Sequence, residues 1–332
     1  MLNDLISIII PVYNASNTLK ECLEAIFASN YSNYEVILID DCSTDNSLEI
    51  ANNFPCKIVK LSQKSGAAAA RNKGAETAQG EIIFFIDSDI IITPNALSII
   101  NENFSNLEIS GVVGLLSAKL RFKNFASQYK NLWMHYTYKI LPDFVGVSYT
   151  SITAFRRNIF LELGGFDKCY KDANVEDTEF GQRFLTKNYK IYSDKRLEAE
   201  HIKHYTLNQV LMLDFKRSYE LTMMFLRNFF KKEKQINYTS VPYTFMLSIL
   251  FAYLSLLFFS FNLFCPNGLL IFGFMFSLLT TIFLNAKYLS YLNKINKFTF
   301  MLQSALFIPL DAIISGSGII IASIRFVFGT RY

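Results

Sequence analysis

The sequence predicts an α/β domain with a doubly wound, mostly parallel sheet, followed by an α-helical membrane region. Apolar segments of strand length alternate with helical segments over residues 7–86, with short loops between them. Carboxylates follow directly after two of these strands, where open α/β sheets bind their ligands. Further along, no charged residue occurs between Lys234 and Lys287, a run of 52 residues. That run is too long for one membrane helix and fits two of roughly 20 residues joined by a turn.

Seven elements alternate in the first part of the chain, beginning and ending with a strand. Proline and asparagine end the first strand, and polar loops separate the others. Polar residues can cap the first two helices, Ser16 or Asn17 for the first and Ser43 or Thr44 for the second. The strands are predicted at 7–14, 35–39, 57–61 and 81–86, and the third helix at 66–78.

The fourth strand ends in two aspartates one residue apart, Asp87 and Asp89. The strand is continuously apolar after its first residue, which is typical of a parallel strand covered on both faces. Its carboxyl end is therefore expected at the ligand-binding edge of the sheet. Hard oxygen ligands at this spacing suit a divalent cation that bridges to phosphate.

Further elements follow this strand. A helix starts at Thr93-Pro94, and Gly164-Gly165 ends another. The aromatic segment 122–143 can line a sugar or lipid groove, or it can take part in ordinary packing. Acidic residues gather at the start of a helix near residue 174, where they can be simple N-terminal charges. Strands are also predicted at 112–119 and 148–155.

The last third of the chain is predicted to contact a membrane. Residues 214–234 mix basic and aromatic side chains, which indicates a helix on an anionic membrane surface or a solvated helix packed on the first domain. Two membrane spans are predicted at about 241–264 and 267–285. A third segment, at about 299–325, is predicted either to span or to be re-entrant.

Asp311 lies near the middle of this third apolar segment, beside Pro309. A charged aspartate at the bilayer centre costs ~2.5–3.5 kcal/mol on insertion scales. A re-entrant hairpin would keep Asp311 in contact with water, and it would leave Arg325 and Arg331 on the inner face, which basic residues prefer. The sequence therefore favours a hairpin over a third span.

The first domain is expected in the cytosol. The N-terminus lacks the basic segment of a signal peptide, and its apolar run is short. The five cysteines are scattered without a CxxC pair, which fits reduced thiols that act as small buried hydrophobes. They are Cys22, Cys42, Cys56, Cys169 and Cys265.

Five motifs occur in order at the predicted strand and helix ends: Pro11-Val12-Tyr13-Asn14, Asp40-Asp41-x-Ser43-x-Asp45, Gly66 to Gly74 with Arg71-Asn72, Asp87-Ser88-Asp89 and Glu176-Asp177. With these motifs the chain resembles glycosyltransferase family 2, the inverting enzymes with the GT-A nucleotide-sugar fold, over about residues 5–205. Each motif alone is weak, but five in order make chance implausible. The resemblance implies a Rossmann-like GT-A domain at 1–206, an amphipathic interfacial region at 207–235 and a transmembrane region at 236–332.

The resemblance implies a site for the nucleotide sugar at the end of the first strands. Pro11 and Tyr13 would pack against the base, with Asn14 in the same loop. Asp41 would accept a hydrogen bond from a ring nitrogen of the base, which favours uracil or thymine. Arg71 would supply positive charge to the nucleotide.

The resemblance also implies a metal ion, Mg²⁺ or Mn²⁺, held against the diphosphate. Asp87 and Asp89 would hold it, with Asp89 the more direct ligand and Ser88 between them in the donor site. His201 lies where some GT-A enzymes carry a further metal ligand, and the alternative is a packed or surface histidine.

The catalytic base implied by the family's Glu-Asp motif is Asp177. Transfer with inversion needs one base, which takes the proton of the acceptor as its oxygen attacks the anomeric carbon. Glu176 would position Asp177 or the acceptor. The Gly164-Gly165-Phe166-Asp167 turn matches a stretch that lies near the donor sugar in the family.

Departures from the family pattern narrow the implied function. The processive cellulose and hyaluronan synthases carry Q-x-x-R-W on the interfacial helix, where this chain has Phe215-Lys216-Arg217-Ser218-Tyr219. Single-sugar transfer is therefore favoured over chain elongation. Polyprenyl-phosphate monosaccharide synthases usually lack a helix like residues 176–183, and they are the first alternative. A non-catalytic nucleotide-sugar-binding scaffold is the second, although it would be expected to lack Asp89 or Asp177.

The favoured interpretation is a hexosyl- or N-acetylhexosaminyltransferase that uses a nucleotide-diphosphate sugar, UDP being the favoured nucleotide. Its acceptor would be a lipid-linked or membrane-proximal glycan. It would also contact membrane lipids, and no nucleic-acid partner is expected. The catalytic domain would face the cytoplasm at the cell membrane.

Overall fold

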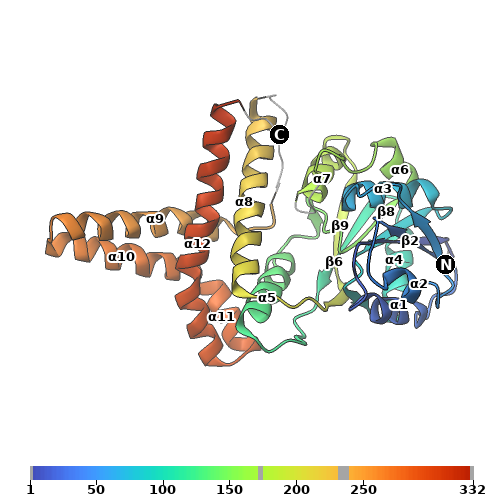
Figure 1. The fold of residues 1–332 in the computed structure, drawn as a ribbon, viewed down its shortest axis with the longest axis horizontal. Helices are drawn as coiled ribbons and strands as arrows, with labels where there is room; N and C mark the ends of the chain where they lie inside the picture. The colour runs from blue at the N-terminus through green and yellow to red at the C-terminus, as the bar shows by residue number, and fades with distance from the viewer. Residues whose placement is uncertain (1–2, 171–174, 231–238, 330–332) are drawn as a thin grey trace. The chain divides into compact units, whose positions relative to one another are not determined.

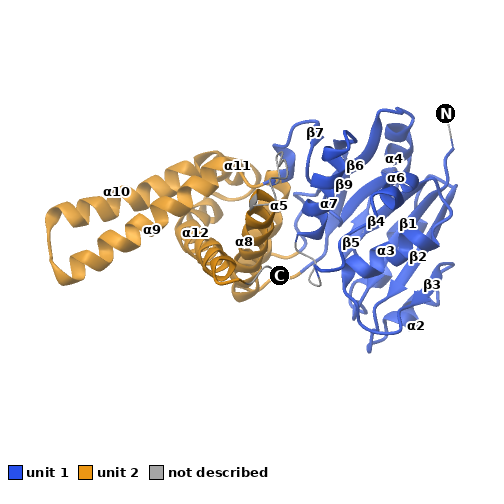
Figure 2. Cartoon of the chain, turned by 90° about the horizontal axis from the view of Figure 1, so that it is seen from above, with its two compact units in different colours: residues 1–121, 138–203, 234–240 blue, residues 122–137, 204–233, 241–332 orange. Residues whose placement is uncertain are grey.

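The computed structural model describes residues 3–170, 175–230 and 239–329. The chain forms two compact units, which Figure 2 colours blue and orange. Unit 1 comprises residues 1–121, 138–203 and 234–240, and unit 2 comprises residues 122–137, 204–233 and 241–332.

Among the described residues of unit 1, a nine-stranded sheet runs in the order β3-β2-β1-β4-β8-β6-β9-β5, and β7 pairs with β9 (Figure 1). Strands β3, β2, β1 and β4 are parallel to one another, whereas β8 runs antiparallel to both β4 and β6. This mixed, mostly parallel sheet confirms the predicted α/β class. The strands are β1 Ile6–Val12, β2 Tyr34–Asp40, β3 Lys57–Lys60, β4 Ile82–Ile86, β5 Ile90–Ile92, β6 Ile109–Leu116, β7 Phe144–Val145, β8 Ile152–Arg156 and β9 Lys190–His201.

The helices of unit 1 follow the predicted alternation, but their first turns differ from expectation. Helix α1 begins after Thr18 and α2 after Asn46, so the expected N-caps at 16–17 and 43–44 are wrong. The Asp45 carboxylate orders both loops instead, because it accepts hydrogen bonds from the backbone N–H groups of Ser16 (2.9 Å) and Ser47 (3.0 Å). The helices are α1 Leu19–Phe27, α2 Ser47–Ala51, α3 Ala67–Thr77, α4 Ala96–Phe104, α6 Arg157–Glu162 and α7 Glu176–Thr186.

Helix α3 packs closely on the sheet because of its small residues. A Cβ atom added at Gly74 would lie 2.3 Å from the Cγ2 atom of Ile9, which is fully buried in β1. A larger side chain at this position would push the helix away from the strand. The close contact fixes the height of the other α3 residues above the carboxyl ends of the strands.

Unit 2 is helical, and several of its helices are long and apolar. By length and composition, α9 and α12 could each cross a membrane, and α10 with α11 would form a third crossing if this pair, bent by 56°, acts as one. Helices α9 and α10 occupy the stretches where the first two spans are predicted, and their crossing of a membrane stays a prediction. The helices are α5 Phe125–Lys139, whose last two residues belong to unit 1, α8 Leu207–Phe230, α9 Tyr243–Phe264, α10 Gly268–Leu284, α11 Ala286–Ile295 and α12 Phe298–Val327.

The aromatic residues of α5 take part in packing within unit 2. The Tyr129 ring lies 4.8 Å from the Phe307 ring, and the Trp133 ring lies 4.9 Å from the Tyr288 ring, measured between centroids. Tyr129 is almost fully buried. Of the two alternatives for this segment, the structure therefore supports ordinary packing for these side chains.

The last apolar segment forms one continuous helix, α12, which includes Pro309. The hairpin that the sequence favours is therefore not formed. Asp311 is buried within the protein: its Oδ2 atom accepts a 2.8 Å hydrogen bond from the Tyr129 hydroxyl, and its Oδ1 atom has no hydrogen-bond partner among the described residues. The predicted interfacial helix at 214–234 corresponds to α8 up to Phe230, and its last residues lie outside the described part of the chain.

Candidate active site

The candidate site lies at the carboxyl edge of the parallel strands in unit 1. Strand β1 pairs in parallel with both β2 and β4, so the residues that follow these strands meet at one edge of the sheet. Asp40 is the last residue of β2, and Asp41 follows it directly. Asp87 and Asp89 follow β4. The structure thus brings together the two groups of carboxylates that the sequence predicts at this edge.

Arg71 is the centre of the site. Its guanidinium donates to Asp87 Oδ1 at 2.7 Å and to Glu176 Oε1 at 2.8 Å. The side chain is only 2% exposed, because α3 holds it beneath the surface. Arg71 therefore links the carboxylate after β4 to the start of α7, and its two NH groups are already used by protein partners.

Two polar atoms beside this bridge are buried and have no hydrogen-bond partner among the described residues. They are Nε of Arg71 and Oε2 of Glu176. Buried polar atoms are normally paired, so such atoms often mark positions where a ligand or water completes the network. The expected contact between Arg71 and the nucleotide stays a prediction, and Nε is the guanidinium atom that remains available for it.

Both oxygens of Asp87 are held by the protein. Oδ1 accepts from Arg71, and Oδ2 accepts a 2.5 Å hydrogen bond from the Ser151 hydroxyl. Ser151 directly precedes β8, which runs antiparallel to β4 with Ile152 opposite Ile86. Sequence reasoning missed Ser151, because only this antiparallel pairing places it beside Asp87.

Asp89 lies next to His201 and Lys203. Its Oδ2 atom is 3.5 Å from His201 Nε2 and 4.0 Å from Lys203 Nζ. The antiparallel pairing of β5 with β9 places His201 opposite Ile90, so the proximity follows from the register. Burial alone would raise the pKa of the Asp89 carboxyl, but the His201 hydrogen bond and the charges of His201 and Lys203 outweigh burial and lower it.

Asp89 and His201 fit a divalent ion better than Asp87 does. Within the residues described, no group of three or more His, Cys, Asp or Glu side chains is arranged to hold a metal ion. The protein would therefore supply two ligands, the Asp89 carboxylate and the His201 imidazole, and phosphate oxygens would supply others. Asp87 would contact the ion less directly, since each of its oxygens already accepts one hydrogen bond, from Arg71 or from Ser151, and keeps only its second lone pair.

Glu176 and Asp177 form the first turn of α7, where the helix dipole favours negative charge. Glu176 is 1% exposed and Asp177 is 7% exposed. Burial and the neighbouring charge of Asp177 raise the pKa of Glu176 to about 7, although Arg71 opposes this. Asp177 Oδ1 accepts a 2.6 Å hydrogen bond from the Thr178 N–H. The predicted start of this helix at residue 174 lies outside the described residues.

The loop that follows β1 contains both exposed side chains and side chains held by hydrogen bonds. The Tyr13 side chain is 45% exposed, and Lys64 Nζ lies 3.7 Å from the centre of its ring. Asn14 adopts a positive φ of 50° and accepts a 2.8 Å hydrogen bond from the Thr44 N–H. Pro11 is partly buried at the end of β1, and Ser88 is partly exposed between the two aspartates. Lys64 is a further candidate that the sequence motifs do not include.

Asp41 orders the loop before α3. Its two oxygens accept hydrogen bonds from the backbone N–H groups of Ser65 (2.6 Å) and Gly66 (2.8 Å). Each carboxylate oxygen has a second lone pair, so these contacts leave capacity for a hydrogen bond from a base. The role of Asp41 in base recognition stays a prediction.

Asn72 ties α3 to the predicted glycine turn. Its side-chain amide donates to the Phe166 carbonyl at 2.7 Å, and its side-chain oxygen accepts from the Phe166 N–H at 2.8 Å. Gly164 and Gly165 have φ angles of 80° and 69°, which favour glycine. The turn is thus fixed to the residue that follows Arg71.

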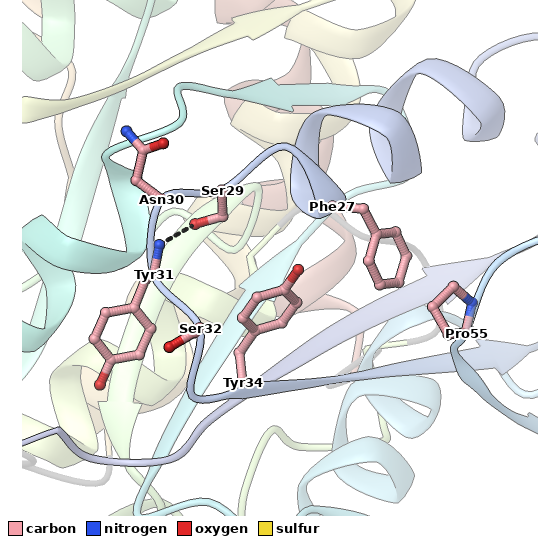
Figure 3. Close-up of a pocket in the computed structure, with 7 residues that line it drawn as sticks. All are labelled: Phe27, Ser29, Asn30, Tyr31, Ser32, Tyr34 and Pro55. Carbon is pink, nitrogen blue, oxygen red and sulfur yellow. Dashed lines mark hydrogen bonds between the residues drawn. The ribbon is translucent and has the colours of Figure 1, made fainter.

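The pocket shown in Figure 3 lies at the other edge of the sheet. Tyr34, which lines it, begins β2, whereas Asp40 ends that strand. The Phe27, Tyr34 and Pro55 side chains form its apolar part, and residues 29–32 supply its polar part. None of the predicted site residues lines this pocket.

Glu176 makes the stability of the chain depend on pH. Its pKa is about 7 in the folded chain, against an ordinary value of 4.5. The unfolded chain therefore releases this proton first as the pH rises. The stabilisation is complete below about pH 4.5 and is lost as the pH passes about 7. We expect Glu176→Gln to flatten the fall of the thermal unfolding midpoint across this range, measured by calorimetry of the full chain in detergent. An unchanged slope would contradict this assignment.

Comparison with known proteins supports the same domain. The family model for glycosyl transferase family 2 matches residues 7–164. Glycosyltransferase GlyG of Streptococcus pneumoniae is 37% identical over 118 residues, which cover 34% of this chain and 39% of that protein. The poly(ribitol-phosphate) beta-glucosyltransferase of Bacillus spizizenii is 36% identical over 122 residues, which cover 33% of this chain and 19% of that protein. The chain thus covers well under half the length of these relatives.

A solved structure supports the fold over a longer range. The mannosyltransferase PcManGT of Pyrobaculum calidifontis, in complex with GDP-Man and Mn²⁺, matches with a TM-score of 0.59 over 99% of this chain and 89% of that chain. At 14% sequence identity this match concerns the fold alone. Residues 7–164 therefore match glycosyltransferase family 2, the chain has a GT-A-like fold, and this domain is followed by apolar helices of the kind that associate with membranes.

Proposed function

We propose that the protein is a metal-dependent inverting glycosyltransferase. It would move one sugar from a nucleotide-diphosphate sugar to a lipid-linked or membrane-proximal glycan. The observation that carries this proposal is the Arg71 bridge, which joins Asp87 on the donor side to Glu176, beside the proposed base Asp177. A transferase needs these two sides held at a fixed distance, because the acceptor must attack opposite the leaving diphosphate.

The donor would bind at the carboxyl edge of the sheet. Pro11, Tyr13 and Asn14 would contact the nucleoside, and Asp41 would accept from an imide N–H, which favours uracil. Asp89 and His201 would hold Mg²⁺ or Mn²⁺ against the diphosphate. When bound, the ion neutralises charge that grows on the leaving group. The similar mannosyltransferase fold, solved with GDP-Man and Mn²⁺, supports a nucleotide sugar with a metal and leaves the choice of base to experiment.

Asp177 would take the proton from the attacking hydroxyl of the acceptor. One base is enough for a single displacement with inversion. Glu176 would hold the start of α7 in place through its ion pair with Arg71. Attachment of the helical unit to the cytoplasmic face of the membrane would bring the acceptor to the site.

A panel of nucleotide sugars tests this proposal. The full chain, purified in detergent or reconstituted in vesicles, is incubated with UDP-, GDP- and dTDP-hexoses, Mn²⁺ and extracted lipid acceptors. We expect release of the nucleoside diphosphate with one donor and the appearance of a singly extended glycan. A product in which the sugar is attached to polyprenyl phosphate would favour the synthase alternative. Donor binding without any turnover would favour the scaffold alternative.

We expect Asp89→Ala to remove metal-dependent donor binding. The variant loses the carboxylate proposed to contact the ion, so the donor affinity in Mn²⁺ should fall by about 100-fold, to the level seen without metal. Isothermal titration calorimetry with and without Mn²⁺ measures this difference. Glu108→Gln is the matched control, because it removes one negative charge from an exposed carboxylate paired with Lys190, outside the site. An Asp89→Ala variant that keeps its Mn²⁺ response would exclude Asp89 as a ligand.

A further inference from the structure

Helix α12 of unit 2 lies between a charged helix and an apolar hairpin. It runs side by side with α8, whereas the hairpin formed by α9 and α10 extends away from α12 on the side opposite α8, crosswise to both helices (Figures 1 and 2). On one side, a Cβ atom added at Gly318 would lie 2.5 Å from the Phe215 carbonyl of α8. On the other, the Tyr253 hydroxyl of α9 donates to the Ile313 carbonyl at 2.9 Å.

One face of α12 is an exposed apolar stripe. Its members recur at three- and four-residue spacing, so they share a face of the helix over roughly 38 Å. The residues of the opposite face are buried, and Ser304, Asp311, Ala312 and Ser315 are among them. The stripe consists of Leu302, Leu306, Leu310, Ile320, Ile324 and Val327, which are between 44% and 79% exposed.

The α9–α10 hairpin packs against this same face of α12. Ile313 and Ser317 continue the spacing between Leu310 and Ile320, and these are the residues that Tyr253 contacts. The side of α12 that faces the hairpin is therefore also the side that exposes the stripe. An apolar hairpin inserted into a bilayer would carry the stripe towards the same bilayer.

Charged residues lie on the opposite side of α12, along its middle. Asp214 on α8 is paired with Lys130, and Asp311 faces Tyr129. Arg217 and Glu220 belong to the stretch of α8 that packs near Gly318. If α12 crossed the membrane, this group would lie near the bilayer centre, where each charged residue costs ~2.5–3.5 kcal/mol.

The ends of α12 argue against a crossing as well. The helix has 30 residues, or about 45 Å, compared with a hydrocarbon core of about 30 Å. Lys297 precedes its start and Arg325 is in its last turn. A crossing would separate these basic residues onto opposite faces of the membrane, whereas basic residues prefer the cytoplasmic face.

We propose that α12 lies along the membrane surface, with its apolar stripe in the lipid and α8 on its wet side, and that only the α9–α10 hairpin enters the bilayer. An amphipathic helix in this position buries its apolar face about 5–10 Å into the headgroup boundary. The inference refines the membrane attachment included in the proposed function, and it replaces both the third span and the re-entrant hairpin. It also leaves Asp311 on the protein side of the helix.

Depth measurements along the stripe test this proposal. Cys42, Cys56, Cys169 and Cys265 are replaced by serine, and the fully buried Cys22 is kept. Single cysteines at Leu306, Leu310, Ile320 and Ile324 then carry a spin label in lipid vesicles, and collision with oxygen and a nickel complex reports depth. We expect all four labels at one shallow depth. A crossing helix, whose midpoint lies near Asp311, would instead place position 310 deepest and position 324 roughly 15 Å shallower, which would overturn the proposal.

Two reference labels separate this inference from membrane attachment itself. A single cysteine at Leu257, which is 50% exposed near the middle of α9, should carry a label that lies deeper than every α12 label. Leu107→Cys on unit 1, where Leu107 is 81% exposed, should be fully accessible to water. A deep label at position 257 with a crossing α12 refutes only the surface helix. A label at position 257 outside the lipid refutes both the surface helix and the proposed membrane attachment.

Sidedness gives a second readout. Single cysteines at Lys297 and Phe328, near the two ends of α12, are treated with a membrane-impermeant maleimide in sealed vesicles. We expect both to react from the same side of the membrane. Reaction from opposite sides would overturn the proposal.

Discussion

Asp177→Asn is expected to lower the rate of sugar transfer by roughly 10²–10⁴-fold, the usual contribution of a general base. The amide cannot take the proton of the acceptor. Its oxygen can still accept the 2.6 Å hydrogen bond from the Thr178 N–H, so the first turn of α7 should keep its geometry. Affinity for the nucleotide sugar should therefore change less than about twofold, since uniform binding does not depend on the base. Single-turnover kinetics and calorimetry separate the two effects.

A neighbouring carboxylate on the same helix provides the control for this variant. Glu179 also lies in the first turn of α7, but it forms a 2.6 Å ion pair with Arg183 and has no proposed part in proton transfer. Glu179→Gln should keep most of the transfer rate. If Asp177→Asn turns over at a rate close to that of the unaltered chain, Asp177 is not the base.

Arg71→Met is expected to destabilise the chain by about 3–5 kcal/mol, as removal of one partner from a buried ion pair usually does. The substitution leaves Glu176, whose side chain is 2% exposed, without its partner, and it frees one oxygen of Asp87. Denaturant titration of the full chain in detergent, followed by circular dichroism, measures this loss. Adding Glu176→Gln to Arg71→Met should restore part of the stability, because a neutral amide then replaces the buried carboxylate.

Arg121 is the matched control for Arg71. It also pairs with two carboxylates, Glu21 at 2.7 Å and Glu200 at 3.1 Å, but its side chain is 35% exposed. Exposed pairs contribute about 0–1 kcal/mol each, so Arg121→Met should cost far less than Arg71→Met. Equal losses from the two substitutions would show that the Arg71 bridge is no more than a surface ion pair.

The parallel strands and their polar exits could be predicted from the sequence, because they rest on local patterns. The apolar run at 82–86 followed by Asp87 and Asp89 identifies both a buried strand and its carboxyl end. Parallel pairing of β1 with β2 and β4 then places these aspartates at one edge with Asp41. Each step depends only on periodicity and on the geometry of α/β sheets.

The partners of these carboxylates depend on contacts between distant parts of the chain. Ser151 reaches Asp87 because β8 inserts antiparallel beside β4, a pairing that no local pattern indicates. Arg71 is expected to face the nucleotide, yet one of its NH groups donates a hydrogen bond to Glu176, which lies 105 residues further along the chain. For Asp311, Tyr129 supplies the hydrogen bond that the sequence expects from water, 182 residues away.

Helix α3 carries Arg71 and Asn72 side by side, and this has a consequence for attempts to change the acceptor by exchanging segments between relatives. Arg71 holds the start of α7, and Asn72 holds the turn at Phe166 through two hydrogen bonds. A segment covering residues 146–186 that is taken from a relative would pack against an α3 from a different parent at both contacts, the one with Glu176 and the one with Phe166. A chimera designed to accept a new glycan should therefore take α3 from the same parent as α7, even though 98 residues (78–175) separate the two helices in the chain.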